Sequence, residues 1–126
     1  MPIVLIVDDY EDACIALERL ARRMGADAAC VTNGTKVLDV MTQRRPSLVI
    51  LDDMMPAVSG LDVLRSIRED AALRDVPVVM YSGSDDAERR AEAAELGALG
   101  WVVKNGHFNE LKTYIAHYGT SANLGV

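Results

Sequence analysis

The sequence predicts a single α/β domain built on a parallel β-sheet, and two observations support this prediction. Short runs rich in Val, Ile and Leu alternate with segments of helical period along the whole chain. Most of these runs are continuously apolar, which is typical of strands that helices cover on both faces. Such alternation favours one domain with right-handed crossovers, and 126 residues are enough for it.

Five short runs are the expected strands: residues 3–7, 28–32, 47–51, 77–81 and 101–103. The second run is Ala-rich and short, so it is the weakest of the five. In the segment after the first run, an apolar stripe from Ala13 to Met24 ends at Gly25, a residue typical of helix termini. Further helices are expected around 37–41, around 61–67, from the capping residues 84–86 to Gly97, and over 108–118.

Composition excludes several classes of protein. The net charge of −6 argues against direct binding to nucleic acid. No apolar run approaches the roughly 20 residues of a membrane span, and the N-terminus lacks the features of a signal peptide. Cys14 and Cys30 form neither a disulfide scaffold nor a metal-ligand spacing, so we expect core thiols and a cytoplasmic protein without membrane attachment.

The domain is expected over residues 1–118, with a flexible tail at 119–126.

Polar side chains follow four of the five expected strands. Asp8 and Asp9 follow the first, Asp52 and Asp53 the third, Ser82 the fourth and Lys104 the fifth. Because ligand sites of such sheets lie at the carboxyl ends of the strands, we expect these groups to converge. Each has a simpler interpretation by itself, since an Asp pair after a strand is most often a turn and helix cap. Their coincidence at four strand ends favours a site.

Clustered carboxylates need a compensating charge. At ~4 Å, and at an effective dielectric constant near 20, each pair of like charges costs about 4 kcal/mol. Oxygen ligands on loops favour Mg²⁺, with Mn²⁺ as a substitute and Zn²⁺ disfavoured. A divalent cation beside an ammonium group attracts an anion such as a phosphoryl group, and a carboxylate of the site can then act as its acceptor. Dinucleotide and P-loop signatures are absent from the sequence.

These residues resemble those of the response regulator receiver domain, the phosphoacceptor module of two-component signalling, over residues 3–118. The most specific stretch is LVILDDMMPAVSGLDVL at 48–64. The family has its phosphorylated Asp four residues before this Pro and eight before this Gly, which selects Asp52 over Asp53. The resemblance implies a doubly wound, flavodoxin-like (βα)₅ three-layer sandwich whose parallel sheet has strand order 2-1-3-4-5.

The resemblance also implies roles for individual residues. Asp9, Asp52 and the backbone carbonyl of Met54 would hold Mg²⁺, and Asp8 would act through a bound water. Asp52 would take the phosphoryl group from a phosphohistidine of a sensor histidine kinase or a histidine phosphotransfer protein. Lys104 would pair with the phosphoryl oxygens. Met54 would give the hydrolysing water no polar anchor, which favours a longer-lived phosphoryl group.

A conformational output is implied as well. Ser82, in place of the commoner Thr, would turn toward the phosphoryl group and leave space for Trp101, the aromatic residue of the fifth strand. The face made by the fourth helix, fifth strand and fifth helix would bind a downstream protein. The family usually has a cis-linked Pro after its Lys, whereas Asn105 follows here, and we expect a trans bond because a non-proline cis bond costs about 3 kcal/mol.

Two other functions stay open at this stage. A pseudo-receiver would use the same fold as a phosphorylation-independent interaction module, and Asn105 is the one feature in its favour. A small Mg²⁺-dependent phosphohydrolase would need a substrate-specificity insertion, which the sequence lacks. We therefore expect a non-enzymatic receiver, monomeric or weakly dimeric.

Overall fold

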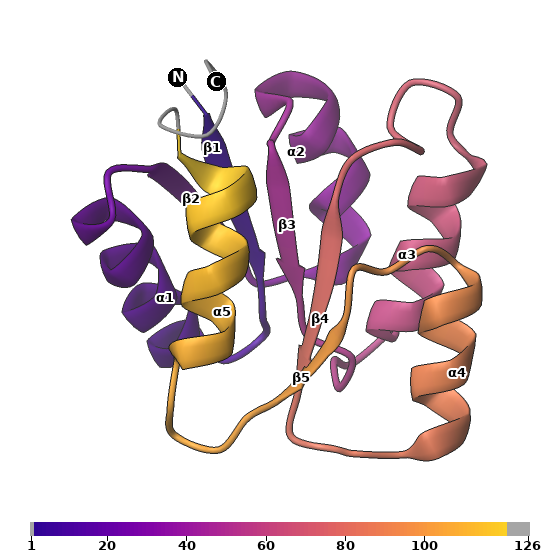
Figure 1. Cartoon of the computed structure of the whole chain (residues 1–126). Helices are drawn as coiled ribbons and strands as arrows, with labels where there is room; N and C mark the ends of the chain where they lie inside the picture. The colour runs from indigo at the N-terminus through magenta and orange to yellow at the C-terminus, as the bar shows by residue number, and fades with distance from the viewer. Residues whose placement is uncertain (1, 121–126) are drawn as a thin grey trace.

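Five parallel strands form one sheet in the order β2-β1-β3-β4-β5 in the computed structural model, which describes residues 2–120 (Figure 1). The strands are β1 (Ile3–Val7), β2 (Asp27–Val31), β3 (Leu48–Leu51), β4 (Val78–Ser82) and β5 (Trp101–Val103). Both the α/β class and the strand order implied by the resemblance are confirmed. The bounds of β1 and β5 match the expectation, whereas β2 and β4 differ by one residue at each end, so that Ser82 belongs to its strand.

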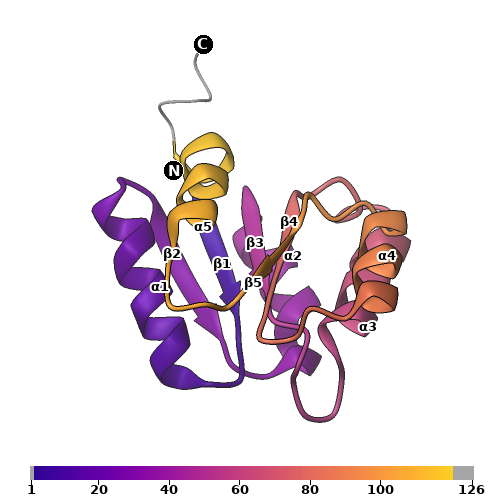
Figure 2. The same cartoon turned by 60° about the horizontal axis from the view of Figure 1, so that its bottom comes forward.

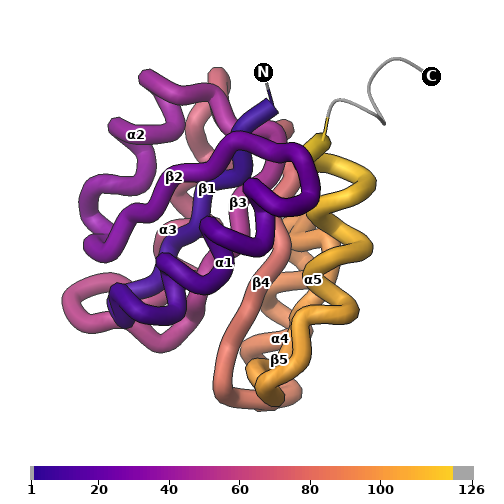
Figure 3. The backbone as a smooth tube through the Cα atoms, turned by 90° about the vertical axis from the view of Figure 1, so that its left-hand side faces the viewer, coloured from indigo at the N-terminus to yellow at the C-terminus, as the bar shows by residue number. Residues whose placement is uncertain are grey.

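Helices cover both faces of the sheet. They are α1 (Glu11–Arg23), α2 (Val37–Arg44) after a 3₁₀ turn (Gly34–Lys36), α3 (Gly60–Glu69), α4 (Ala87–Glu95) and α5 (Asn109–Tyr114), which continues as a π-helical turn (Ile115–Gly119). The helices α1 and α5 pack on one face, and α2, α3 and α4 pack on the other. Figure 3 shows α2 and α5 on opposite sides of the strands.

The core consists of two apolar layers, one on each face of the sheet. Alternate residues of a strand contribute to opposite layers: Leu5 packs toward α2 and α3, whereas its neighbour Ile6 packs toward α1 and α5. Every residue of β1, β3 and β4 is buried, which explains why the sequence pattern of these strands is continuous instead of alternating.

The C-terminal end of the described chain is packed against the domain. Gly119 ends the last helical turn, and a Cβ atom added to it would lie 2.7 Å from a methyl group of Val4. Thr120 is also buried, so the first two residues of the expected tail pack against the domain. The rest of that tail, 121–126, lies outside the described residues. No helix within 2–120 is long and apolar enough to cross a membrane.

The carboxyl ends of β1, β3, β4 and β5 lie at one edge of the sheet, the lower edge in Figure 1. Figure 2 turns this edge toward the viewer, with the loops that follow the strands in front. The parallel register of Val7 with Leu51 and of Ser82 with Val103 brings the residues that follow these strands together.

Candidate functional site

Three carboxylates from two strand ends meet at this edge. Oxygen atoms of Asp8, Asp9 and Asp52 all lie within 4.8 Å of one another. Asp8 and Asp52 are buried, with 2% and 4% of their surface exposed, whereas Asp9 is exposed. The backbone N–H of Asp52 donates to the carbonyl of Val7 at 2.9 Å, so the pairing of β1 with β3 extends to the acidic residues themselves.

Lys104 provides the positive charge of the cluster. Its Nζ donates to Oδ2 of Asp8 at 2.7 Å and lies 3.6 Å from Oδ1 of Asp52. Burial alone would lower the pKa of Lys104, but the contact with Asp8 and the charge of Asp52 raise it above its usual value. The side chain is therefore a cation at neutral pH, and it can attract an anion that enters the pocket.

Asp52 is the carboxylate whose protonation depends most on its surroundings. Burial raises the pKa of Asp52 to about 6, although Lys104 and the backbone N–H of Met54 favour the charged form. The nearby charges of Asp8 and Asp9 contribute to this raised pKa. A divalent cation in the cluster would remove this repulsion and keep Asp52 ionised, as a carboxylate must be to act as a nucleophile.

Asp53, the other half of the acidic pair, has a structural partner instead. Its side chain is fully buried and accepts hydrogen bonds from Nε and Nη2 of Arg89 on α4, the latter at 2.8 Å. It also accepts from the backbone N–H of Leu61 at the start of α3, at 3.2 Å. The two neighbouring carboxylates thus face different surroundings, and only Asp52 belongs to the acidic cluster.

The loop after β3 is held close to Asp52 by a glycine. A Cβ atom added to Gly60 would lie 2.2 Å from the carbonyl oxygen of Asp52 and 2.7 Å from Cα of Asp53. Helix α3 begins here, with Ser59 and Asp62 in a reciprocal capping box. Met54, a predicted ligand through its carbonyl, donates its backbone N–H to Oδ1 of Asp52 at 3.2 Å, and its side chain is 63% exposed.

Ser82 and Trp101 both contact Ser84, in the loop between β4 and α4. The Oγ atom of Ser82 accepts the backbone N–H of Ser84 at 3.2 Å, and the Trp101 indole N–H donates to the Ser84 carbonyl at 2.9 Å. Ser82 is fully buried, and Trp101 is 8% exposed. The two predicted switch residues are therefore linked through one backbone unit.

The chain around Asn105 is consistent with the expected backbone geometry. None of the peptide bonds that the structure describes is cis, so the bond between Lys104 and Asn105 is trans, as expected. The backbone N–H of Lys104 donates to the carbonyl of Ser82 at 2.8 Å, which extends the pairing of β4 with β5. Lys104 reaches the cluster without a proline after it.

Comparison with known proteins identifies the family. The family model of the response regulator receiver domain matches residues 4–116. The chain belongs to the response regulator receiver family. It is 36% identical over 103 residues to the transcriptional regulatory protein PrrA of Mycobacterium tuberculosis, covering 82% of this chain and 43% of that protein. The DNA-binding response regulator MtrA of Mycobacterium leprae is 35% identical over 101 residues, 80% of this chain and 44% of that protein. The receiver chain thus spans less than half the length of these relatives.

Solved structures have the same fold. The response regulator TrrA of Thermotoga maritima, solved in complex with Mg²⁺ and BeF, is 29% identical with a TM-score of 0.80, over 91% of this chain and 96% of that one. A response regulator receiver protein of Pseudomonas putida is 28% identical with a TM-score of 0.84, over 90% and 94% of the two chains. The chemotaxis protein CheY4 of Vibrio cholerae, at 23% identity, has a TM-score of 0.85 over 94% and 98%.

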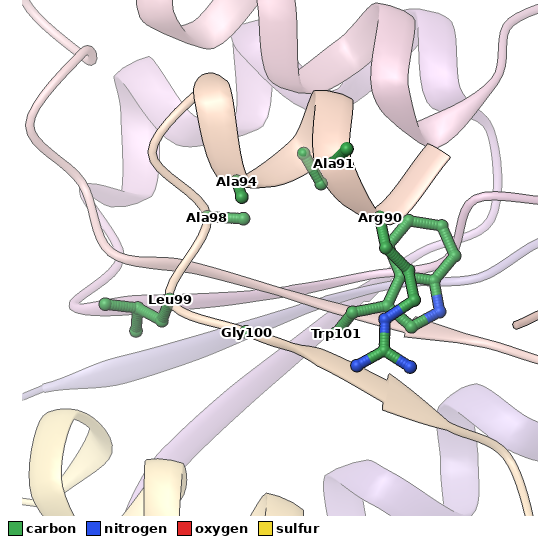
Figure 4. A pocket seen from close by; sticks show the side chains of 8 residues that line it. Arg90, Ala91, Ala94, Ala98, Leu99, Gly100 and Trp101 are labelled. Atoms are coloured by element: carbon green, nitrogen blue, oxygen red, sulfur yellow. The ribbon is translucent and has the colours of Figure 1, made fainter. Parts of the chain in front are cut away.

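A groove lies beside Trp101 on the face that the resemblance assigned to output. It has a volume of about 340 Å³ and is lined mainly by alanines of α4 and by residues 98–101 that lead into β5. Figure 4 shows the side chain of Arg90 beside the Trp101 ring at one end of this groove. The groove of this receiver thus borders the residue predicted to move.

Sequence reasoning missed two residues near the site. Arg89 lies 36 positions from its partner Asp53, and nothing in the local sequence distinguishes it from the neighbouring Arg90, which pairs with Asp85. Tyr81 appeared only as an apolar strand residue, yet its ring lies under the ammonium group of Lys104. Both contacts join elements whose proximity is a property of the fold.

The raised pKa of Asp52 predicts a pH-dependent cost to the stability of the metal-free receiver. The stability difference between Asp52→Asn and the wild type should be smallest near pH 3, where Asp52 is protonated in both folded and unfolded chains. From there to above pH 6 the wild type loses stability relative to the variant, because its native carboxyl resists ionisation, and the difference should grow by about 3 kcal/mol. Urea titrations in chelator would measure it. A difference that does not change with pH would contradict the prediction.

Gly60→Ala should destabilise the receiver by about 3 kcal/mol, because the new methyl group meets backbone atoms that cannot rotate away. Gly83→Ala is the matched control, since a Cβ atom there meets nothing within 4 Å. Urea unfolding of both variants measures the effect. Equal stability of the two variants would show that the loop can move away from Asp52 at little cost.

Arg89→Gln should cost about 2–3 kcal/mol because the buried carboxylate of Asp53 loses its cation and keeps only the N–H of Leu61. The double variant Asp53→Asn with Arg89→Gln removes both charges and should recover part of that loss. Arg65→Gln is the control: Arg65 also joins α3 to α4 through Glu92, but both side chains are 44% exposed, so the cost should stay below about 1 kcal/mol. Double-mutant analysis of urea titrations tests the set, and additive losses would contradict it.

Proposed function

We propose that this receiver domain accepts a phosphoryl group on Asp52 from a phosphohistidine donor, in a step that depends on Mg²⁺. The observation that carries the proposal is the meeting of Asp8, Asp9 and Asp52 with Lys104 in one pocket. Asp52, whose pKa is raised to about 6, is one of these carboxylates, and it must be ionised in order to accept the phosphoryl group.

The donor set fits a hard divalent cation. Asp8, Asp9 and Asp52 offer carboxylate oxygens within 4.8 Å of one another, and oxygen ligands are those that Mg²⁺ prefers, with Mn²⁺ as a substitute. These residues, with the carbonyl of Met54, would hold the ion. When bound, the cation would neutralise the crowded carboxylates and polarise the incoming phosphoryl oxygens. TrrA of Thermotoga maritima, described with Mg²⁺ and BeF, supports this assignment.

The residues of the pocket would divide the chemistry among them. An oxygen of Asp52 forms a bond to phosphorus while the bond between phosphorus and the donor histidine nitrogen breaks, and the electron pair leaves with the imidazole. The ammonium group of Lys104 moves from Asp8 to the phosphoryl oxygens as they gain charge. Because the acyl phosphate stays on the receiver, the domain acts as a signalling module and not as a turnover enzyme.

A protein donor fits the rim of the pocket. Tyr10 follows Asp9 directly and is 63% exposed, and Met54, two residues after Asp52, is equally exposed. Large apolar side chains at the mouth of a charged pocket are a common feature of protein docking surfaces. We therefore favour a sensor histidine kinase or a histidine phosphotransfer protein as the phosphoryl donor.

Output would pass through Ser84. If the Ser82 hydroxyl turns to the phosphoryl group, the Ser84 N–H loses its acceptor, and the residue whose carbonyl holds Trp101 is less firmly fixed. The groove beside Trp101 would then change shape, which suits a downstream protein on the face of α4, β5 and α5. The expected absence of direct nucleic-acid binding by this chain, its cytoplasmic location and its monomeric or weakly dimeric state stay predictions, and the named relatives include a DNA-binding regulator.

The pseudo-receiver is the competing function. Its one supporting feature was Asn105, but the trans bond before this residue leaves Lys104 in contact with Asp8. No acidic position of the expected site is substituted. The geometry therefore favours a receiver that accepts a phosphoryl group over a pseudo-receiver.

Acetyl phosphate with Mg²⁺ should add one phosphoryl group to the wild-type chain, as measured by intact mass, and beryllofluoride should change the fluorescence of Trp101. Asp52→Asn should abolish both signals, whereas Asp53→Asn is the matched control and should keep them, because that carboxylate lies outside the cluster. A phosphoryl group retained in Asp52→Asn, or no mass gain in the wild type with acetyl phosphate or with phosphohistidine donors, would reject the proposal.

A further inference from the structure

An aromatic ring lies beneath the key cation of the pocket. Nζ of Lys104 lies over the ring of Tyr81, 5.4 Å from its centre. Tyr81 is 5% exposed, and it packs in the apolar layer on the side of α1 and α5. A buried ring near the end of a core strand is a rigid platform, so its position under Lys104 is set by the fold.

The chain after Lys104 does little to direct its side chain. Asn105 and Gly106 are exposed, and Gly106 has a positive φ of 84°. Asn105 uses its side chain to accept the N–H of His107 at 3.0 Å, which makes a local turn. The hydrogen bond from the Lys104 N–H to Ser82 fixes the backbone only. The ammonium group is therefore directed by its side-chain contacts, which are Asp8, Asp52 and the Tyr81 ring.

Binding of a metal ion and a phosphoryl group in the pocket would affect these three contacts of Lys104 differently. The carboxylates of Asp8 and Asp52 that attract Lys104 also offer oxygens to a metal ion, so the two cations compete for the same side chains. The face of the Tyr81 ring attracts an ammonium group through its quadrupole but has no net charge. It neither binds the metal ion nor repels an incoming phosphoryl group, and so it can keep its contact throughout.

We propose that Tyr81 is a positioning residue, whose ring face keeps the Lys104 ammonium at the edge of the pocket while the carboxylates turn to the metal ion. This inference rests on the proposed function, because the position matters for a phosphoryl group on Asp52. The ring supplies the effect and the hydroxyl does not, which makes Tyr81→Phe the conservative variant and Tyr81→Leu the disruptive one.

The contact itself can be tested without metal or phosphoryl donor. Protons that lie over an aromatic ring are shifted upfield, and the chain has only three lysines, Lys36, Lys104 and Lys112, so the signals of their ε-methylene groups are easily assigned with Lys104→Ala as a reference. The Lys104 signal should lie upfield of the other two in the wild type and in Tyr81→Phe, and should join them in Tyr81→Leu. An unshifted Lys104 signal in the folded wild type would overturn the placement.

The positioning role is tested by separate titrations with Mg²⁺ and with beryllofluoride at saturating Mg²⁺, followed by Trp101 fluorescence. Tyr81→Leu should bind beryllofluoride about three- to tenfold more weakly, a range within what a cation–π contact supplies, with unchanged Mg²⁺ affinity. Tyr81→Phe should behave as the wild type. A merely structural role would weaken both affinities together, or neither, and either result would overturn the proposal.

A shape-matched variant covers the case in which Tyr81→Leu does not fold. Highly fluorinated phenylalanine at position 81 keeps a ring of similar size but removes the negative face, so beryllofluoride affinity should fall while Mg²⁺ affinity and stability stay constant. Unchanged beryllofluoride affinity would reject the ring face as the cause. If the wild type failed to accept phosphorus at all, the proposed function would fall, and an upfield Lys104 signal would show that the contact beneath Lys104 exists independently of it.

Discussion

Repulsion between carboxylates that the fold forces together is the constraint on which the rest of the site depends. Asp8 and Asp52 are buried within reach of each other because β1 and β3 are paired up to their last residues. Lys104 compensates part of this charge, yet Asp52 still has a pKa of about 6. A pocket with this excess of negative charge favours the binding of a further cation. The bound cation can then attract an anion.

The surrounding structure keeps this unfavourable cluster in place. Gly60 lets the start of α3 approach the backbone of Asp52, and Asp53 is fixed by Arg89 and by the N-terminus of α3. The end of β3 is thus held by contacts with α3 and α4. Since desolvated groups at a site need such support, these contacts stabilise the end of β3 although Asp53 and Arg89 lie outside the cluster.

Helix α4 connects the contacts of Asp53 to the face that we propose for output. Arg89 joins the first turn of α4 to Asp53. Arg68 of α3 donates to the carbonyls of Leu96 and Gly97, which directly follow α4. The same helix lines the groove beside Trp101. The loop at Ser84 and α4 therefore connect the surroundings of Asp52 to the groove beside Trp101, the route along which the proposed output would pass.

The sequence by itself determined the fold class, the five strands and the four polar strand ends, because apolar periodicity and strand-end position are local properties of the chain. Through the family resemblance, the spacing to Pro56 and Gly60 also favoured Asp52 as the phosphoacceptor, and it is Asp52 that lies in the acidic cluster. Only the tertiary structure decided that Asp53 binds Arg89 and that Tyr81 lies under Lys104. These contacts join residues from different strands and helices, and their distances depend on how helices and strands pack, which no local pattern encodes.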